Sequence, residues 1–129
     1  MKKITEDWLH SAESDLTLIH SIIDQDSLTH QVAFHSQQAI EKCFKAIIEE
    51  YDLGFIKTHS LQTLSSLVKG RIDLQYHVDM LIILDQLYID ARYPGELGLL
   101  PNGKPSLHES KEFTDLANGI HVKTKELLQ

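Results

Sequence analysis

The sequence predicts an all-α fold, an antiparallel up-and-down bundle of about five helices. Apolar residues recur at the three- and four-residue spacing of buried helix faces in several long segments. No segment shows the sustained polar-apolar alternation of a half-buried strand. The connections between most of the predicted helices are short, which favours antiparallel neighbours. A chain of 129 residues with 42% hydrophobic content is long enough for one core, so we expect residues 1–129 to form a single domain.

Two long helices are expected in the first part of the chain. The first begins near Thr5, a suitable N-cap. Its apolar stripe comprises Trp8, Leu9, Ala12, Leu16, Ile19 and Ile23. After a connection over residues 24–27, the second helix is expected from about Leu28 to Tyr51, ending before Gly54, which suits the left-handed conformation. Its stripe comprises Ala39, Ile40, Cys43, Phe44, Ile47 and Ile48.

A short third helix and a strongly apolar fourth helix follow. The cluster Thr58-His59-Ser60 is suited to capping the third helix, which we expect to end at Gly70. Asp73 is suited to capping the fourth, which continues to Arg92 and is terminated by Pro94-Gly95. Residues 80–84 are all apolar and so cover the whole circumference of that helix. This segment must therefore be covered on more than one side, either within the bundle or by a second subunit.

The last helix is preceded by a connection rich in Gly and Pro. Residues 95–105 form this connection, whose length is at the upper end of the ordinary range. Ser106 and Glu109 then form a capping box, which predicts the start of a fifth helix. Its apolar stripe comprises Phe113, Leu116, Ala117, Ile120 and Leu127.

Composition and charge exclude several classes of function. The formal net charge of -7 argues against a protein that binds nucleic acid through a wide basic surface. The one cysteine, Cys43, cannot form an intramolecular disulfide and lies in an apolar stripe, so we expect a cytoplasmic protein with an unreactive thiol. We see no signal peptide and no run of about 18 apolar residues, and so expect no membrane association.

Neither a metal nor another cofactor is expected from the sequence. The eight histidines do not fall at the spacing of metal ligands, and no His-Glu-x-x-His or Cys-x-x-Cys pattern is present. The glycines stand singly and do not form a phosphate-binding loop.

The second helix carries an unusual polar row beside its apolar stripe. His35, Gln38, Lys42 and Lys45 lie at i, i+3, i+7 and i+10, and thus share one helical face. An imidazole, an amide and two ammonium groups together predict a surface for an anion or a nucleotide. The alternative is a solvated flank, in which the lysine methylenes cover neighbouring apolar surface.

The end of the fourth helix offers a second polar face. Asp85, Tyr88 and Arg92 lie at i, i+3 and i+7. Arg92 is suited to binding a phosphate, while Tyr88 or Tyr93 is suited to stacking on a base. The alternative is that Arg92 interacts only with the negative end of the helix dipole, or with Asp85 or Glu96.

Three motifs together resemble the HEPN domain family. They are His35-x-Gln-Gln-Ala-x-Glu-Lys-x-x-Lys45, Thr58-His59-Ser60-Leu61 and Tyr88-x-x-x-Arg92-Tyr93-Pro94. The chain is most similar to the branch of small stand-alone prokaryotic HEPN proteins. That resemblance implies an antiparallel helical bundle, usually a homodimer. It also implies a gene pair with a small nucleotidyltransferase, of the toxin-antitoxin kind, and nucleotide binding or joint action with that partner.

The leading hypothesis is therefore a non-catalytic accessory protein with a polar groove between the second helix and the end of the fourth. The expected ligand-binding residues are His35, Gln38, Lys42, Lys45, His59, Tyr88, Arg92 and Tyr93, and the expected ligand is a nucleotide, RNA or a phosphate-bearing partner.

Two alternatives remain open. Another branch of the family consists of metal-independent ribonucleases with an Arg-x(4 to 6)-His motif, in which histidine is the acid or base and arginine a phosphate clamp. Arg71 and His77 have that spacing, although the polar residue that commonly follows the arginine is missing. The second alternative is a pure interaction module, which neither binds a nucleotide nor cleaves RNA but forms a stable complex with a nucleotidyltransferase.

Overall fold

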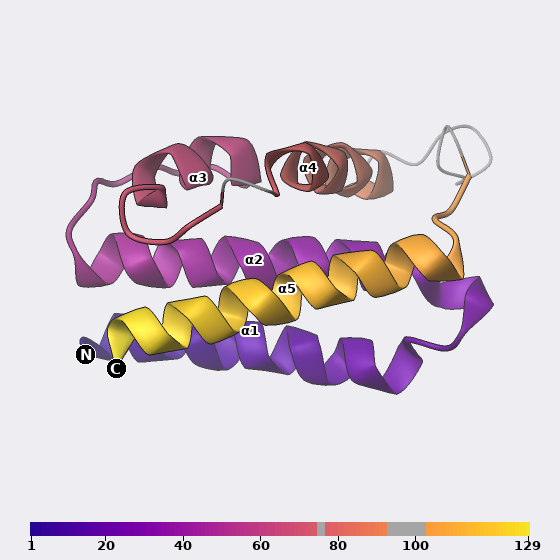
Figure 1. Ribbon diagram of the computed structural model, residues 1–129, viewed down its shortest axis with the longest axis horizontal. Coiled ribbons are helices and arrows are strands. Elements are labelled where there is room, and N and C mark those ends of the chain that lie inside the picture. The colour runs from indigo at the N-terminus through magenta and orange to yellow at the C-terminus, as the bar shows by residue number, and fades with distance from the viewer. Residues whose placement is uncertain (75–76, 93–102) are drawn as a thin grey trace.

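The all-α prediction is confirmed by the arrangement of the chain. The computed structural model describes residues 1–74, 77–92 and 103–129, with only the backbone of Arg92. These residues form helices and no strand (Figure 1). The elements are α1 (Lys3–Ile22), the 3-10 turn η1 (Asp26–Leu28), α2 (Thr29–Glu50), α3 (Leu61–Val68), α4 (Val78–Arg92) and α5 (Leu107–Leu128).

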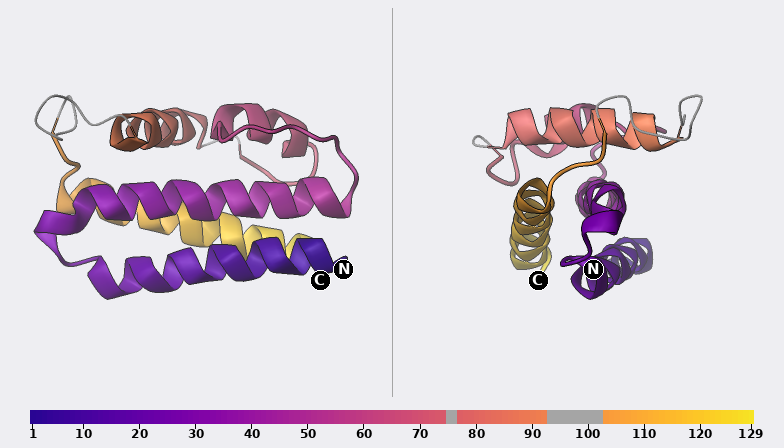
Figure 2. Two further views of the ribbon diagram at one scale, coloured as in Figure 1. Left: turned by 180° about the vertical axis from the view of Figure 1, so that it is seen from behind. Right: turned by 90° about the vertical axis from the view of Figure 1, so that its right-hand side faces the viewer.

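Three long helices form a bundle that two shorter helices cover on one side. Helices α1, α2 and α5 have their long axes roughly aligned, and α3 and α4 lie over α2 on the side opposite α1 (Figures 1 and 2). Helix α1 is antiparallel to α2, whereas α5 runs in the same direction as α2, and α4 crosses the long helices. Both termini lie at the same end of the molecule.

Helix α2 is the centre of the core. It packs against α1, α3, α4 and α5. Its fully buried side chains include Ile40, Cys43, Phe44 and Ile47, as its apolar spacing predicts. A helix that packs against several others exposes little surface to solvent. The polar residues of α2 must therefore find partners on neighbouring elements.

Several helix ends were predicted correctly. Ser60 accepts a hydrogen bond from the backbone N–H of Thr63 and caps α3. Ser106 and Glu109 form the expected capping box of α5. The bounds of α2 differ from the expected ones by a single residue at each end, and Gly54 has the positive φ expected after it.

Other helix ends differ from the sequence prediction. Helix α1 begins at Lys3, so Thr5 lies inside it, and its hydroxyl donates to Glu50 Oε1 over 2.9 Å. The hydroxyl of Thr5 thus joins α1 to the end of α2 and does not cap α1. Helix α4 begins at Val78, well after Asp73. Pro94 and Gly95, expected to end α4, lie outside the described residues.

The apolar segment of α4 is covered on one side only. Leu81 and Leu84 are buried, whereas Ile82 and Ile83 are 41% and 48% exposed. Ile89 on the same helix is also exposed. Helix α4 therefore presents isoleucines to solvent in the single chain, and the described residues do not cover its whole circumference. Within the described residues no helix is long and apolar enough to cross a membrane.

Cys43 should be chemically inert in the folded protein. Complete burial raises the pKa of its thiol from 9.0 to about 12, and only the thiolate reacts with disulfide reagents. We expect a thiol-disulfide reagent at pH 8 to leave the native protein unlabelled and to label one thiol per chain in denaturant. Because the neutral thiol is favoured in the fold, this group should lower the free energy of unfolding as pH rises from about 9 to about 12. Rapid stoichiometric labelling of the native protein would contradict this assignment.

Candidate functional site

Asp15 from α1 binds two side chains of the polar row on α2, which comprises His35, Gln38, Lys42 and Lys45. His35 Nδ1 donates to Asp15 Oδ1 over 2.9 Å, and Lys42 Nζ donates to Asp15 Oδ2 over 2.7 Å. All three side chains are largely buried. We call these three residues the Asp15 cluster. One carboxylate thus holds both an imidazole and an ammonium group in place.

A matching cluster lies on the other side of the same face, toward α3 and α4. Glu41, whose side chain is 4% exposed, accepts from Lys45 Nζ over 2.8 Å and from His59 Nδ1 over 3.1 Å. Gln37 Nε2 lies 3.4 Å from Glu41 Oε1 and donates to the backbone carbonyl of His59 over 2.8 Å. Glu41, Lys45 and His59 form the Glu41 cluster. Again one buried carboxylate orients one lysine and one histidine.

A row of four rings joins the two clusters. Phe34 meets the ring of His35 edge-on at 5.2 Å between centroids, and stacks on Tyr88 from α4 at 5.5 Å. The ring of Tyr88 in turn lies 5.6 Å from that of His59. Tyr88 is only 8% exposed. The row therefore ties α4 to α2 and to the segment before α3.

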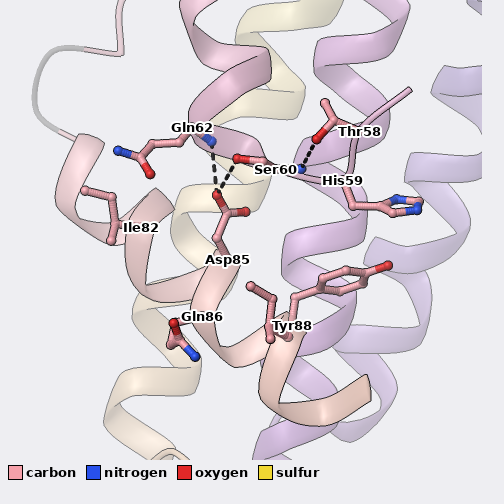
Figure 3. Close-up of a pocket in the computed structure, with 9 residues that line it drawn as sticks. Thr58, His59, Ser60, Gln62, Ile82, Asp85, Gln86 and Tyr88 are labelled. Carbon is pink, nitrogen blue, oxygen red and sulfur yellow. Dashed lines mark hydrogen bonds between the residues drawn. The ribbon is translucent and has the colours of Figure 1, made fainter. Parts of the chain in front are cut away.

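A cavity of about 440 Å³ opens beside His59 and Tyr88. Its walls are Thr58, His59, Ser60, Gln62, Ile82, Asp85, Gln86, Tyr88 and Ile89. Figure 3 shows Asp85 directed at Ser60 and Gln62, while the rings of His59 and Tyr88 lie next to each other. Asp85 accepts from the backbone N–H groups of Leu61 and Gln62 over 2.8 and 3.1 Å. It thereby satisfies the first turn of α3 and is a structural residue.

The side chains of six of the eight predicted ligand-binding residues lie among the described residues. Gln38 donates to Gln37 Oε1 over 2.8 Å, and the ammonium of Lys45 lies 5.3 Å from the centre of the Trp8 ring. The predicted row is divided between two carboxylates, because His35 and Lys42 bind Asp15 while Lys45 binds Glu41. The side chain of Arg92 and all of Tyr93 lie outside the described residues, so their opposition to α2 stays a prediction.

Arg71 and His77, the alternative catalytic pair, have different surroundings. The guanidinium carbon of Arg71 lies 4.1 Å from the ring centre of Tyr51. His77 lines a separate hollow of about 350 Å³, together with residues of α4 and α5 that include Asp115 and Lys123. Neither residue belongs to the cavity beside His59.

Four organising residues were not among the predicted ligand-binding residues, namely Asp15, Phe34, Gln37 and Glu41, although Gln37 and Glu41 belong to the first of the three motifs. Asp15 carried a signal, since it lies three residues after Ala12 and four before Ile19, within the apolar stripe of α1. Glu41 likewise lies four residues before Lys45, at the spacing of a helical ion pair. A charged residue inside a buried stripe indicates a partner on the next helix. Among the described residues, His, Cys, Asp and Glu side chains form no group of three or more suited to a metal ion.

Comparison with known proteins identifies the family. The HEPN domain model matches residues 5–124 of the chain. The chain belongs to the HEPN domain family. The resemblance inferred from the three motifs is thus confirmed. The chain is also similar in structure to ST0689, an archaeal HEPN homologue, with a TM-score of 0.74, 23% sequence identity and complete coverage of both chains. At that identity the likeness shows the HEPN fold. No curated protein sequence matches the chain.

The capping role of Asp85 can be tested by truncation. Asp85→Ala removes the acceptor for two backbone N–H groups of α3, and should lower the free energy of unfolding by about 1–3 kcal/mol. Asp90→Ala is the matched control, because Asp90 on the same helix accepts only an exposed bond from Gln86 among the interactions described. Chemical denaturation of both variants gives the comparison. Equal stabilities for the two variants would refute the capping role.

Proposed function

We propose that this HEPN-domain protein binds a nucleotide, or another phosphate-bearing ligand, at the α2 face between the two clusters and the cavity. In this proposal it is a non-catalytic accessory partner of a small nucleotidyltransferase, in a toxin-antitoxin-like pair. The observation that carries the proposal is the pair of buried carboxylates, each holding a histidine and a lysine beside the aromatic row. Burying charge is costly, so two buried carboxylates on one face of the molecule need a reason beyond packing.

The proposed contacts follow from side-chain chemistry. The ligand-binding residues are His35, Gln38, Lys42, Lys45, His59, Tyr88, Arg92 and Tyr93. A base has more access to the ring of His59, whose side chain is 55% exposed, than to Tyr88, whose ring lies against Phe34. Arg92 supplies the bidentate phosphate contact in this proposal. The net charge of -7 favours a small ligand or a single unpaired RNA end over a long nucleic acid.

Calorimetric titration tests the proposal directly. We expect ATP to bind the wild type, and His59→Ala and Arg92→Ala each to weaken binding about tenfold or more, since a hydrogen bond to a charged group contributes about 1.5–3 kcal/mol. His108→Ala is the control, because His108 lies on the exposed surface of α5 and pairs only with Glu112 among its described contacts.

Other outcomes would favour other functions. Absence of binding for ATP and other nucleotides would refute the ligand proposal. RNA cleavage by purified protein that is lost in His77→Ala would favour the ribonuclease alternative. A stable complex with a nucleotidyltransferase, without either activity, would favour the interaction module.

We further propose that a second copy of the chain covers the outer face of α4. Val78, Ile82, Ile83 and Ile89 are exposed on this helix, and several large apolar side chains exposed on one helix are typical of subunit interfaces. A two-fold axis brings the same face of each copy together. Since Ile82 and Ile89 also line the cavity, the second copy would form part of its rim.

The dimer is tested by charge substitution. Ile83→Glu puts a carboxylate into the proposed interface, so we expect it to shift sedimentation velocity from dimer to monomer. Val122→Glu, at an equally exposed position on α5, should leave the dimer unchanged. A wild-type protein that sediments as a monomer at all concentrations would rule the dimer out.

A further inference from the structure

The two lysines of the α2 face carry no uncompensated charge. Lys42 is paired with Asp15, and Lys45 is paired with Glu41. Two ammonium groups and two carboxylates sum to zero while the imidazoles are neutral. A phosphate that approaches the described side chains of these clusters thus meets a net positive charge only when a histidine is protonated. Histidine is the side chain that changes charge between about pH 5 and pH 8.

His59 is the histidine that meets a ligand. Its side chain is 55% exposed, against 21% for His35. A carboxylate only accepts hydrogen bonds, so the contact with Glu41 places the proton of the neutral ring on Nδ1. Nε2 of the neutral ring is then a hydrogen-bond acceptor and cannot bind a phosphate oxygen, which is also an acceptor. Protonation turns Nε2 into a donor without moving the ring. In Figure 3 the ring of His59 and the hydroxyl of Tyr88 point to the same side, away from Asp85.

We propose that the site takes up a phosphate group together with one proton, carried by His59. The imidazolium Nε2–H donates to a phosphate oxygen, while Glu41 positions the ring and compensates its charge. This inference rests on the proposed nucleotide binding and adds the group that contacts the phosphate. Lys42 and Lys45 are each paired with a buried carboxylate, so they add little net positive charge to the site.

The surroundings of His59 determine the direction of the pH dependence. The charged groups nearest His59 on α2 are Glu41 and Lys45, which are paired with each other. On the other side lie the ring of Tyr88 and the carboxylate of Asp85, which accepts a hydrogen bond from the Ser60 hydroxyl. A bound phosphate adds negative charge, which favours the protonated form. Affinity should therefore rise as pH falls from 8 toward 6, by at most about tenfold per pH unit for one proton.

Calorimetry in paired buffers measures this proton directly. ATP is titrated into the wild type at several pH values between 6 and 8, in two buffers of different ionisation enthalpy, and the difference in observed heat gives the protons taken up. We expect net uptake approaching one proton per ATP near pH 7–8. His59→Gln should abolish the part of the uptake that is carried by the histidine, while any proton taken up by ATP itself remains. His108→Gln, the same change on the exposed surface of α5, should retain it.

Glu41→Gln tests the positioning role separately. The amide oxygen still accepts from Nδ1, but the negative charge is lost, so the rise in affinity should move to lower pH while a thermal melt shows that the protein stays folded. Binding of ATP with no difference in proton uptake between the wild type and His59→Gln would overturn the inference and leave nucleotide binding intact. Failure of ATP to bind at any pH would refute both.

Discussion

The central position of α2 is the constraint on which the rest of the structure depends. Its packing against four other helices leaves only a narrow strip of polar surface, and Asp15 and Glu41 lie at the edges of that strip with almost no access to water. An unpaired carboxylate in such a place would cost several kcal/mol. Each therefore requires a lysine and a histidine, and the core thereby determines where these cationic side chains point. The candidate site is in this sense a consequence of how α2 is buried.

Helices α3 and α4 are joined to this centre by two different kinds of contact. Asp85 binds the first turn of α3 through hydrogen bonds, and Tyr88, one turn later, packs on Phe34 of α2. A single helical segment thus connects α3 to α4 and α4 to α2. The segment that carries His59 lies between these contacts, with its carbonyl oxygen bonded to Gln37. Its exposed imidazole is consequently held at a defined position, which is what ligand recognition requires.

Sequence patterns predicted the fold because they report local properties. The buried stripe of α2, the Ser60 cap and the capping box of α5 each depend on residues within one or two helical turns. The same patterns order residues around a single helix but do not say which neighbour each face meets. His35 and Lys42 therefore appeared as a free cationic row, while their partner Asp15 lies on another helix. Thr5 was misread for the same reason, since Glu50 satisfies it from the far end of α2.

Counting lysines on a helix face consequently overestimates its attraction for anions. The charge that matters is the sum over a cluster, and here each lysine is offset by a buried carboxylate. In a chain with a net charge of -7, general electrostatic attraction for phosphate is weak. Recognition of a phosphate must therefore come from side chains that are held in place at the site or become charged when the ligand binds. A histidine held by a carboxylate meets that requirement, because the hydrogen bond fixes the orientation of the ring and the ring can still gain a proton when the ligand binds. The proposed second copy adds to this by enclosing the cavity rim at Ile82 and Ile89, where lower solvent access would strengthen each contact that His59 makes.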